Sequence, residues 1–256
     1  MSSQPTSTPF DAYSHYYNLL YQDKNYEAEV EYITGLLKHH GVMGPELLEF
    51  GSGTGRHGRL LASRGYRVLG VERSAAMVAN VLPAPGFDCI QGDIRTVRIE
   101  RKFDAVLSLF HVMSYLTENT DVQHVFDRAA EHLRPGGLFI FDVWYSPAVY
   151  AQRPETRVKR MFDDQVDIVR IAEPLLRPNE NRVDVNYSII ARNRSTNEVE
   201  TIVETHPMRH FSLPELEAIA QRHGFSRLAT EEFISGNQPS ERTWGVCIVL
   251  RKDSND

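Results

Sequence analysis

Acidic residues follow three successive apolar runs of the chain, and the first lies just before a glycine-rich turn. Glu49 is two residues before Gly51-Ser-Gly-Thr-Gly55, Glu72 ends the next apolar run, and Asp93 follows a third. If these runs are neighbouring parallel strands, their carboxyl ends meet at one edge of a sheet. The glycines let the backbone turn tightly there and approach a ligand. We therefore expect a ligand site lined by three carboxylates.

The glycine turn fits two classes of ligand. Gly53-Thr-Gly-Arg-His-Gly58, with Glu72 placed 19 residues beyond Gly53, matches the dinucleotide fingerprint, so an NAD(P)-dependent oxidoreductase is one alternative. A pyrophosphate is an anion, however, and the Glu49 carboxylate would repel it. S-adenosylmethionine carries an ammonium and a sulfonium, which a carboxylate attracts. Glu49 therefore favours S-adenosylmethionine, whereas Glu72 can accept hydrogen bonds from the ribose hydroxyls of either ligand.

The third carboxylate suits the adenine end of such a cofactor. Asp93 can accept a hydrogen bond from the adenine amino group, and a neighbouring backbone N–H, for which we take Ile94, can serve a ring nitrogen. A solvated aspartate in a turn is the alternative interpretation of this position.

These motifs and their order resemble the class I S-adenosylmethionine-dependent methyltransferases. The resemblance covers about residues 25–143 and is carried by Glu49-x-Gly51-x-Gly53-x-Gly55, Glu72, Gly92-Asp93-Ile94 and Leu133-Arg-Pro-Gly-Gly137. It implies S-adenosylmethionine as the cofactor, bound at the carboxyl ends of the strands. It also implies a doubly wound sheet of roughly seven strands, of which the last is antiparallel.

A looser similarity points to the N-methyltransferases of nucleotide-linked amino sugars. It rests on the tyrosine-rich segment of residues 13–21, on Phe110, and on an insertion after the fifth strand. In the similar members such a segment closes over the cofactor, which implies cofactor contacts for Tyr17, Tyr26 and Phe110. A helix that packs its tyrosines against the sheet is the alternative.

A methyl acceptor that is an alcohol or phenol requires a general base, whereas a neutral amine requires little further help. The candidates near the strand ends are His111, Tyr115 and Asp142. The similar enzymes carry a histidine where this chain has Tyr115, so the role of base cannot be transferred by position. Each residue also has a structural interpretation: a loop cap for His111, packing for Tyr115, and a backbone contact for Asp142.

The elements that position these residues alternate between strand and helix. The predicted strands are residues 46–50, 66–71, 87–91, 104–109 and 138–142. The predicted helices are residues 24–39, 59–63, 75–82 and 122–133, and a later one begins at Ser212, which forms a capping box with Glu215. Such alternation predicts a Rossmann-like α/β fold with a doubly wound, mostly parallel sheet.

The pattern changes to a two-residue period after the fifth strand. Val183, Val185 and Tyr187 alternate with polar residues, and residues 166–171 and 199–205 predict two further strands. An antiparallel β insertion over residues 156–210 follows from this, as a roof over the substrate or a dimer contact. The predicted domain that binds S-adenosylmethionine comprises the remaining ordered segments, residues 10–145 and 211–252, and residues 1–9 form a flexible tail.

The composition limits the partners of the chain. The 28 Lys and Arg against 34 Asp and Glu give a net charge of −6, which argues against nucleic acid. No segment approaches the ~20 apolar residues of a membrane span, and no His/Cys cluster has metal-site spacing. Two cysteines suit a reducing cytoplasm. We therefore expect a cytoplasmic methyltransferase acting on N or O of a small molecule; a non-catalytic interaction protein is the remaining alternative.

Overall fold

The computed structural model describes residues 16–254, apart from the side chains of Tyr17 and Asn18, and the predicted tail of residues 1–9 lies outside that range. The described chain divides into two compact units. The parallel-sheet unit contains residues 25–152 and 209–254, and the antiparallel unit contains residues 16–24 and 153–208. The predicted division placed residues 10–24 with the parallel sheet, whereas residues 16–24 pack with the antiparallel strands.

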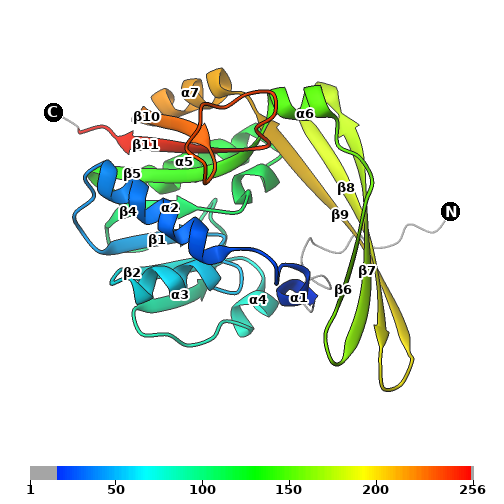
Figure 1. The fold of residues 1–256 in the computed structure, drawn as a ribbon. Coiled ribbons are helices and arrows are strands. Elements are labelled where there is room, and N and C mark those ends of the chain that lie inside the picture. The colour runs from blue at the N-terminus through cyan, green and yellow to red at the C-terminus, as the bar shows by residue number, and fades with distance from the viewer. Residues whose placement is uncertain (1–15, 255–256) are drawn as a thin grey trace. The chain divides into compact units, whose positions relative to one another are not determined.

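Seven strands form the sheet of the parallel-sheet unit (Figure 1). They are β1 (Glu46–Phe50), β2 (Arg67–Glu72), β3 (Phe87–Gln91), β4 (Phe103–Ser108), β5 (Leu133–Tyr145), β10 (Phe225–Glu232) and β11 (Gly245–Lys252). Their order is β3-β2-β1-β4-β5-β11-β10, with β1 to β5 parallel and β11 antiparallel to both neighbours. This confirms the Rossmann-like fold and its antiparallel last strand.

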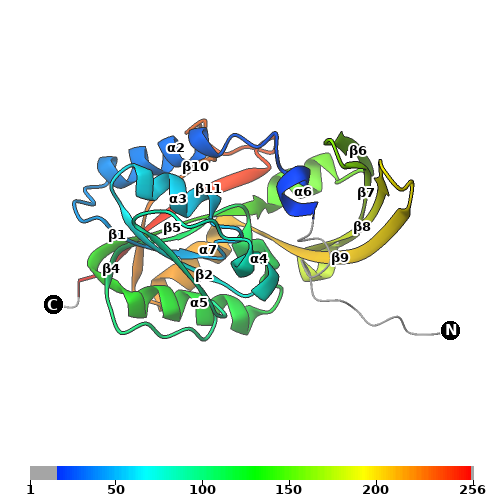
Figure 2. The same cartoon turned by 90° about the horizontal axis from the view of Figure 1, so that it is seen from below.

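Helices cover both faces of this sheet. They are α2 (Tyr26–His39), α3 (Arg56–Ser63), α4 (Ala75–Ala79), α5 (Asn119–His132), α6 (Ser146–Gln152) and α7 (Leu213–Arg222), with a short 3-10 helix η2 (Val112–Tyr115). Figure 2 shows α2 and α3 on one face and α5 on the opposite face. Apolar residues of α2 and α3 form one core cluster, and those of α5 and α7 form the other. Residues 138–143 of β5 are buried throughout, as a strand covered on both faces requires.

The antiparallel unit contains four strand segments, one more than predicted. Its elements are α1 (Tyr17–Leu20), β6 (Arg157–Phe162), β7 (Val166–Arg177), the 3-10 helix η3 (Pro178–Glu180), β8 (Arg182–Asn193) and most of β9 (Val199–Phe211). The strands follow the order β9-β8-β7-β6, and one face carries a core of Met161, Ile168, Ile189 and Ile202 with Leu20 of α1. The inserted antiparallel unit is thus confirmed, and β6 was missed.

Two local predictions were wrong. Ser212 is the N-cap residue of α7 but makes no capping hydrogen bond with its side chain, and Glu215 instead accepts a hydrogen bond from Arg209 at 2.6 Å. A charged guanidinium is a stronger donor than the backbone amide that a capping box requires. The strand expected at residues 138–142 also extends from Leu133 to Tyr145, because its ends pair with neighbouring strands.

Candidate active site

The glycine turn between β1 and α3 has three left-handed residues, and they serve different purposes. Gly51, Gly53 and Gly55 have φ values of 70°, 56° and 75°. A Cβ atom at Gly51 would lie 2.6 Å from Val112, and one at Gly55 would lie 2.4 Å from Phe87. At Gly53 the nearest described atom would be 3.8 Å away. Gly51 and Gly55 therefore allow close packing, whereas Gly53 presents its backbone to space that a ligand can occupy.

Glu72, at the end of β2, holds the glycine turn in place. Its Oε2 accepts a hydrogen bond from the backbone N–H of Gly53 at 2.9 Å, and its Oε1 accepts one from Ser74 N–H at 2.8 Å. The side chain is nearly buried. The carboxylate thus connects the turn after β1 to the segment after β2.

The carboxyl group of Glu49, at the end of β1, is buried. Its residue is 1% exposed, and its Oε2 has no hydrogen-bond partner among the described residues. Burial first, and then the neighbouring Glu72 carboxylate, raise the pKa of Glu49 to about 8, against the opposing effect of the Gly58 backbone N–H. An unpartnered, buried carboxyl oxygen at the end of β1, near Gly58 of α3, suits the ammonium or sulfonium of S-adenosylmethionine.

A buried histidine, which the sequence analysis did not single out, lies between two glutamates at this site. His57 Nε2 is 2.7 Å from Glu29 Oε2, and its Nδ1 is 3.7 Å from Glu49 Oε1. The Tyr26 ring packs on His57 with centroids 4.9 Å apart and lies under the Arg56 guanidinium. Tyr26, predicted as a cofactor contact, therefore also orders this cluster. The Tyr17 side chain lies outside the described part of the structure.

Asp93 is held by an arginine that the sequence analysis also overlooked. Arg95 Nε and Nη2 donate to the two Asp93 oxygens at 2.9 and 2.6 Å, and Arg95 Nη1 donates to Asp121 at 2.8 Å. The hydrogen bonds from Arg95 lower the pKa of Asp93. Asp93 is thus a fixed carboxylate at the end of β3, and Ile94 beside it is mostly buried.

Two of the catalytic candidates form a close pair. His111 Nδ1 lies 2.6 Å from Asp142 Oδ2, and the His111 backbone N–H donates to the same oxygen at 3.1 Å. The Asp142 side chain is 1% exposed and that of His111 is 23% exposed. This His111–Asp142 pair connects the loop after β4 to β5. Tyr115, the third candidate, lies at the end of η2.

The backbone that presents His111 is strained. Phe110 and His111 are consecutive non-glycine residues with φ values of 65° and 60°. Each such residue costs on the order of 1–3 kcal/mol, and strain of this kind is concentrated at functional sites. The turn fixes the imidazole over Asp142, and it places Phe110, predicted as a cofactor contact, beside it.

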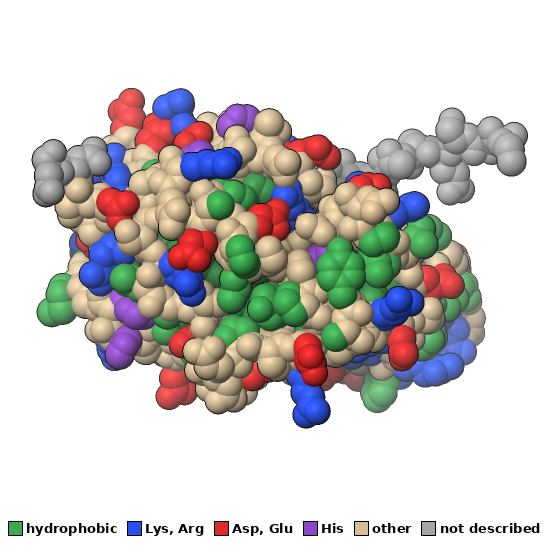
Figure 3. Space-filling view, turned by 90° about the horizontal axis from the view of Figure 1, so that it is seen from above, with side chains coloured by type: hydrophobic (Ala, Val, Ile, Leu, Met, Phe, Trp, Pro, Cys, Tyr) green, Lys and Arg blue, Asp and Glu red, His purple; other side chains and the backbone are tan. Residues whose placement is uncertain are grey.

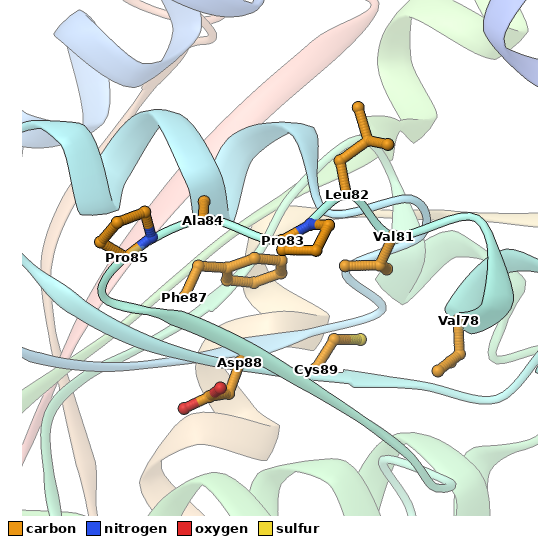
Figure 4. Close-up of a pocket in the computed structure, with 9 residues that line it drawn as sticks. All are labelled: Val78, Val81, Leu82, Pro83, Ala84, Pro85, Phe87, Asp88 and Cys89. Atoms are coloured by element: carbon orange, nitrogen blue, oxygen red, sulfur yellow. The ribbon is translucent and has the colours of Figure 1, made fainter.

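A separate cavity of about 540 Å³ lies along the edge strand β3. Figure 4 shows Phe87 and Cys89 on one side of β3, near the segment of residues 81–85, and Asp88 directed away from them. Cys89 Sγ lies 3.3 Å from Ser52 Oγ of the glycine turn. The predicted site residues do not line this cavity, so it is distinct from the strand-end site.

The face drawn in Figure 3 does not carry charge of a single sign, and the described helices include no membrane span. On the face drawn in Figure 3, acidic and basic side chains are interspersed. No helix in residues 16–254 is long and apolar enough to cross a membrane. Within the same range, no cluster of three or more His, Cys, Asp or Glu side chains is arranged to hold a metal ion.

The chain is similar to methyltransferases in sequence. Residues 47–137 match the methyltransferase domain family. A dTDP-3-amino-3,4,6-trideoxy-alpha-D-glucopyranose N,N-dimethyltransferase of Streptomyces venezuelae is 29% identical over 68% of this chain and 74% of its own length. A dTDP-3-amino-3,6-dideoxy-alpha-D-glucopyranose N,N-dimethyltransferase of Streptomyces fradiae is 26% identical over 88% and 86%.

Solved structures share the fold. A sugar N-methyltransferase from a Streptoalloteichus species superposes with a TM-score of 0.80 at 21% identity, over 99% of both chains. An S-adenosylmethionine-dependent methyltransferase from Clostridium acetobutylicum gives 0.78 at 19% identity, over 96% of this chain and all of the other. The match to a methyltransferase domain favours the methyltransferase prediction over the dinucleotide alternative. The chain thus contains a methyltransferase domain over residues 47–137 and has the fold of S-adenosylmethionine-dependent methyltransferases.

Proposed function

We propose that this methyltransferase transfers methyl groups to the amino nitrogen of a nucleotide-linked amino sugar. Three of its relatives are named as N,N-dimethyltransferases of dTDP-linked amino sugars. The observation that carries the proposal is the His111–Asp142 pair. A neutral amine needs little further help, but an aliphatic amine is protonated at neutral pH and must lose a proton before its lone pair can attack the methyl carbon. An amine acceptor that binds as an ammonium ion therefore also needs such a base.

In this proposal His111 is the general base. Its Nδ1 lies 2.6 Å from Asp142 Oδ2, so the carboxylate favours a proton on Nδ1 and leaves the Nε2 lone pair to accept the proton of the acceptor. Asp142 orients the ring and stabilises the imidazolium that results. S-adenosylmethionine, when bound, supplies an electrophilic methyl group on its sulfonium. The chain otherwise contributes alignment of the acceptor and exclusion of water.

The cofactor contacts proposed for the parallel-sheet unit follow the geometry of the strand ends. Glu49 attracts the ammonium and sulfonium, Gly53 lets the cofactor approach the backbone, and Glu72 accepts hydrogen bonds from the ribose. Asp93 accepts a hydrogen bond from the adenine amino group. An ionised carboxylate offers about four lone-pair sites, and three donors of Arg95, its backbone N–H, Nε and Nη2, leave about one for the adenine. Tyr26, Phe110 and Ile94 supply the remaining proposed contacts.

An acceptor assay tests the proposed function. Protein that binds S-adenosylhomocysteine is incubated with methyl-labelled S-adenosylmethionine and a dTDP-linked 3-amino-3,6-dideoxy sugar or its 3-hydroxyl counterpart. We expect label on the amino sugar and little on the hydroxyl sugar. Transfer to the hydroxyl sugar alone, or no transfer to any amino sugar nucleotide in a panel of positional isomers, would refute the proposal.

The raised pKa of Glu49 predicts that cofactor binding depends on pH. Below a pKa of about 8 the carboxyl is neutral, whereas the cationic cofactor favours the carboxylate, so binding expels a proton. Affinity for S-adenosylhomocysteine, which keeps the ammonium, should rise by up to about tenfold per pH unit between about pH 6 and 7.5. Calorimetry in buffers of different ionisation enthalpy measures both the affinity and the released proton.

Glu49→Gln should remove this pH dependence and weaken binding, whereas Glu46→Gln on the same strand should leave both unchanged. The free energy of unfolding of the cofactor-free protein depends on pH in the opposite sense to the cofactor affinity. Folding takes up a proton between pH 4.5, the ordinary pKa, and about 8, so the contribution of Glu49 to the free energy of unfolding falls as pH rises through that window. An affinity that is flat with pH in the unmodified protein would contradict this account.

Gly245 leaves room for the catalytic imidazole. A Cβ atom at Gly245 would lie 3.2 Å from His111 Cε1, tighter than an ordinary contact. We expect Gly245→Ala to displace the ring slightly and to lower kcat by about tenfold, because proton transfer depends steeply on position. Gly35→Ala in α2, where a Cβ meets nothing within 4 Å, is the control and should leave kcat unchanged. Equal rates for the two variants would contradict a positioned base.

We also propose that the antiparallel unit forms a homodimer contact. The sheet face opposite its core leaves Val158, Ile190 and Val203 exposed by 53%, 37% and 62%. An exposed apolar stripe of this kind is typical of an interface. Light scattering should give a dimer mass that Val203→Asp reduces to that of a monomer, whereas a monomeric unmodified protein would refute the contact.

A cytoplasmic location completes the proposal. Cys89 and Cys247 are both free thiols, which suits a reducing compartment. Fractionation of cells that produce the tagged full-length chain tests this location.

A further inference from the structure

Two tryptophans that lie far apart in the sequence meet beside the His111–Asp142 pair. Trp144 follows Asp142 by two residues at the end of β5, and Trp244 directly precedes β11. Their rings are 5.4 Å apart at an interplanar angle of 64°. The Trp144 ring is in turn 6.3 Å from the His111 imidazole. Both indoles are only partly buried, so the pair, which we call the tryptophan wall, extends from the proposed base towards solvent.

The backbone holds this wall firmly. Trp144 N–H donates to the buried Ser114 hydroxyl at 3.1 Å, and Trp244 C=O accepts from Tyr145 N–H at 3.0 Å. The loop before Trp244 is fixed by the nearly buried Thr243, whose hydroxyl accepts from Ser240 N–H at 3.0 Å. The rings are thus supported by β5, η2 and β11 and not by a mobile terminus.

The geometry points to an acceptor subsite in which the tryptophan wall binds the acceptor as an ammonium ion and delivers it to His111. The inference rests on the proposed function, and it makes the wall the element that selects amines over alcohols. An indole face attracts a cation through its quadrupole, and more strongly when water is excluded. The ammonium then passes one N–H proton to His111 Nε2, and the nitrogen keeps the electron pair with which it attacks the methyl carbon. As this N–C bond forms, the bond from the methyl carbon to the sulfonium breaks, its electron pair stays on sulfur, and S-adenosylhomocysteine leaves. A hydroxyl acceptor carries no charge for the wall to attract.

The tryptophan wall can be monitored by fluorescence because its two members are the 2 tryptophans of the chain. Excitation selective for tryptophan therefore reports on this subsite alone, and Trp144→Phe or Trp244→Phe separates the two rings. The first probe is tetramethylammonium chloride, added to protein saturated with S-adenosylhomocysteine, with sodium chloride at equal ionic strength as the control. We expect a saturable fluorescence change with tetramethylammonium and none with sodium.

The second measurement uses the dTDP-linked amino sugar and its hydroxyl counterpart with variants of Trp244. Trp244→Leu should raise KM for the amine by about 3- to 30-fold, the range expected for one cation–π contact, with a smaller effect on kcat. Trp244→Phe keeps an aromatic face and should restore most of the affinity. A merely structural tryptophan would lower thermal stability and S-adenosylhomocysteine affinity together, without a change in the preference for amine over hydroxyl.

The outcomes separate this inference from the proposed function. If the amino sugar is methylated but Trp244→Leu keeps the same preference for the amine, the tryptophan wall is not the selective element. The inference is then refuted, and the proposed function stands. If tetramethylammonium binds saturably but no amino sugar nucleotide is methylated, the cation subsite stands and the proposed acceptor is wrong. If tetramethylammonium and sodium give the same fluorescence, the wall does not bind cations.

Discussion

His111→Asn is expected to lower kcat by about 10²- to 10⁴-fold, the usual contribution of a general base. Asparagine tolerates the left-handed backbone of this turn, and its amide N–H₂ can still donate to Asp142. The variant therefore keeps the fold and the partner of Asp142 and removes only the capacity to accept a proton. Steady-state kinetics with the labelled methyl donor measure the loss.

The loss of kcat in His111→Asn should become smaller as pH rises, because an amine that is already deprotonated in solution does not need the base. S-adenosylhomocysteine affinity is expected to stay within about twofold of the unmodified value, since the side chain of His111 is proposed to act on the acceptor and not to contact the cofactor. Asp142→Asn should give a smaller loss, because the imidazole remains but is no longer held in the productive tautomer. If His111→Asn had a normal kcat at neutral pH, alignment of the acceptor with the methyl group would be sufficient for catalysis, and His111 would not act as the general base.

Glu72→Ala is expected to weaken cofactor binding by about 1–3 kcal/mol, which is about 5- to 150-fold in Kd. The carboxylate has two tasks here. It is proposed to hold the ribose, and it accepts hydrogen bonds from Gly53 N–H and Ser74 N–H. Its removal leaves the glycine turn without its main polar support, so both the cofactor contact and the shape of the site are lost. Calorimetry with S-adenosylhomocysteine measures the change.

Asp88→Ala is a suitable control for Glu72→Ala, because it removes an exposed carboxylate from the neighbouring strand β3 and should leave Kd unchanged. Removal of Glu72 also takes away the charge that raises the pKa of Glu49. Proton release on cofactor binding should therefore decrease at neutral pH. Unchanged affinity in Glu72→Ala would refute its role at the site.

The strand-end carboxylates and the glycine turn could be predicted because their positions depend on residues that are adjacent in the sequence. An apolar run that stops at a glycine predicts both a strand and its end, and parallel strands bring their carboxyl ends together. Glu72 accordingly binds Gly53 N–H, and its charge acts on Glu49 at the end of the neighbouring strand. Burial was also predictable for β5, where a continuous apolar run indicates a strand that helices cover on both faces.

Pairing between side chains was not predictable in the same way. Arg95, which binds Asp93, also binds a second carboxylate, that of Asp121 in α5. Likewise, Glu215 pairs with Arg209 and not with the N-terminus of its own helix. A propensity describes a residue and its neighbours in sequence, whereas a charged group takes the strongest partner that the fold brings within reach.

The sequence by itself determined the class of fold, the edge of the sheet at which the cofactor is proposed to bind, and the preference for a cationic cofactor. Spacing and residue type are enough for these, because strand ends and charge signs are local properties. Only the tertiary structure decided that His111 pairs with Asp142 and that Trp144 faces Trp244. The members of each pair lie on different strands or loops, and their distances depend on how β4, β5 and β11 lie side by side.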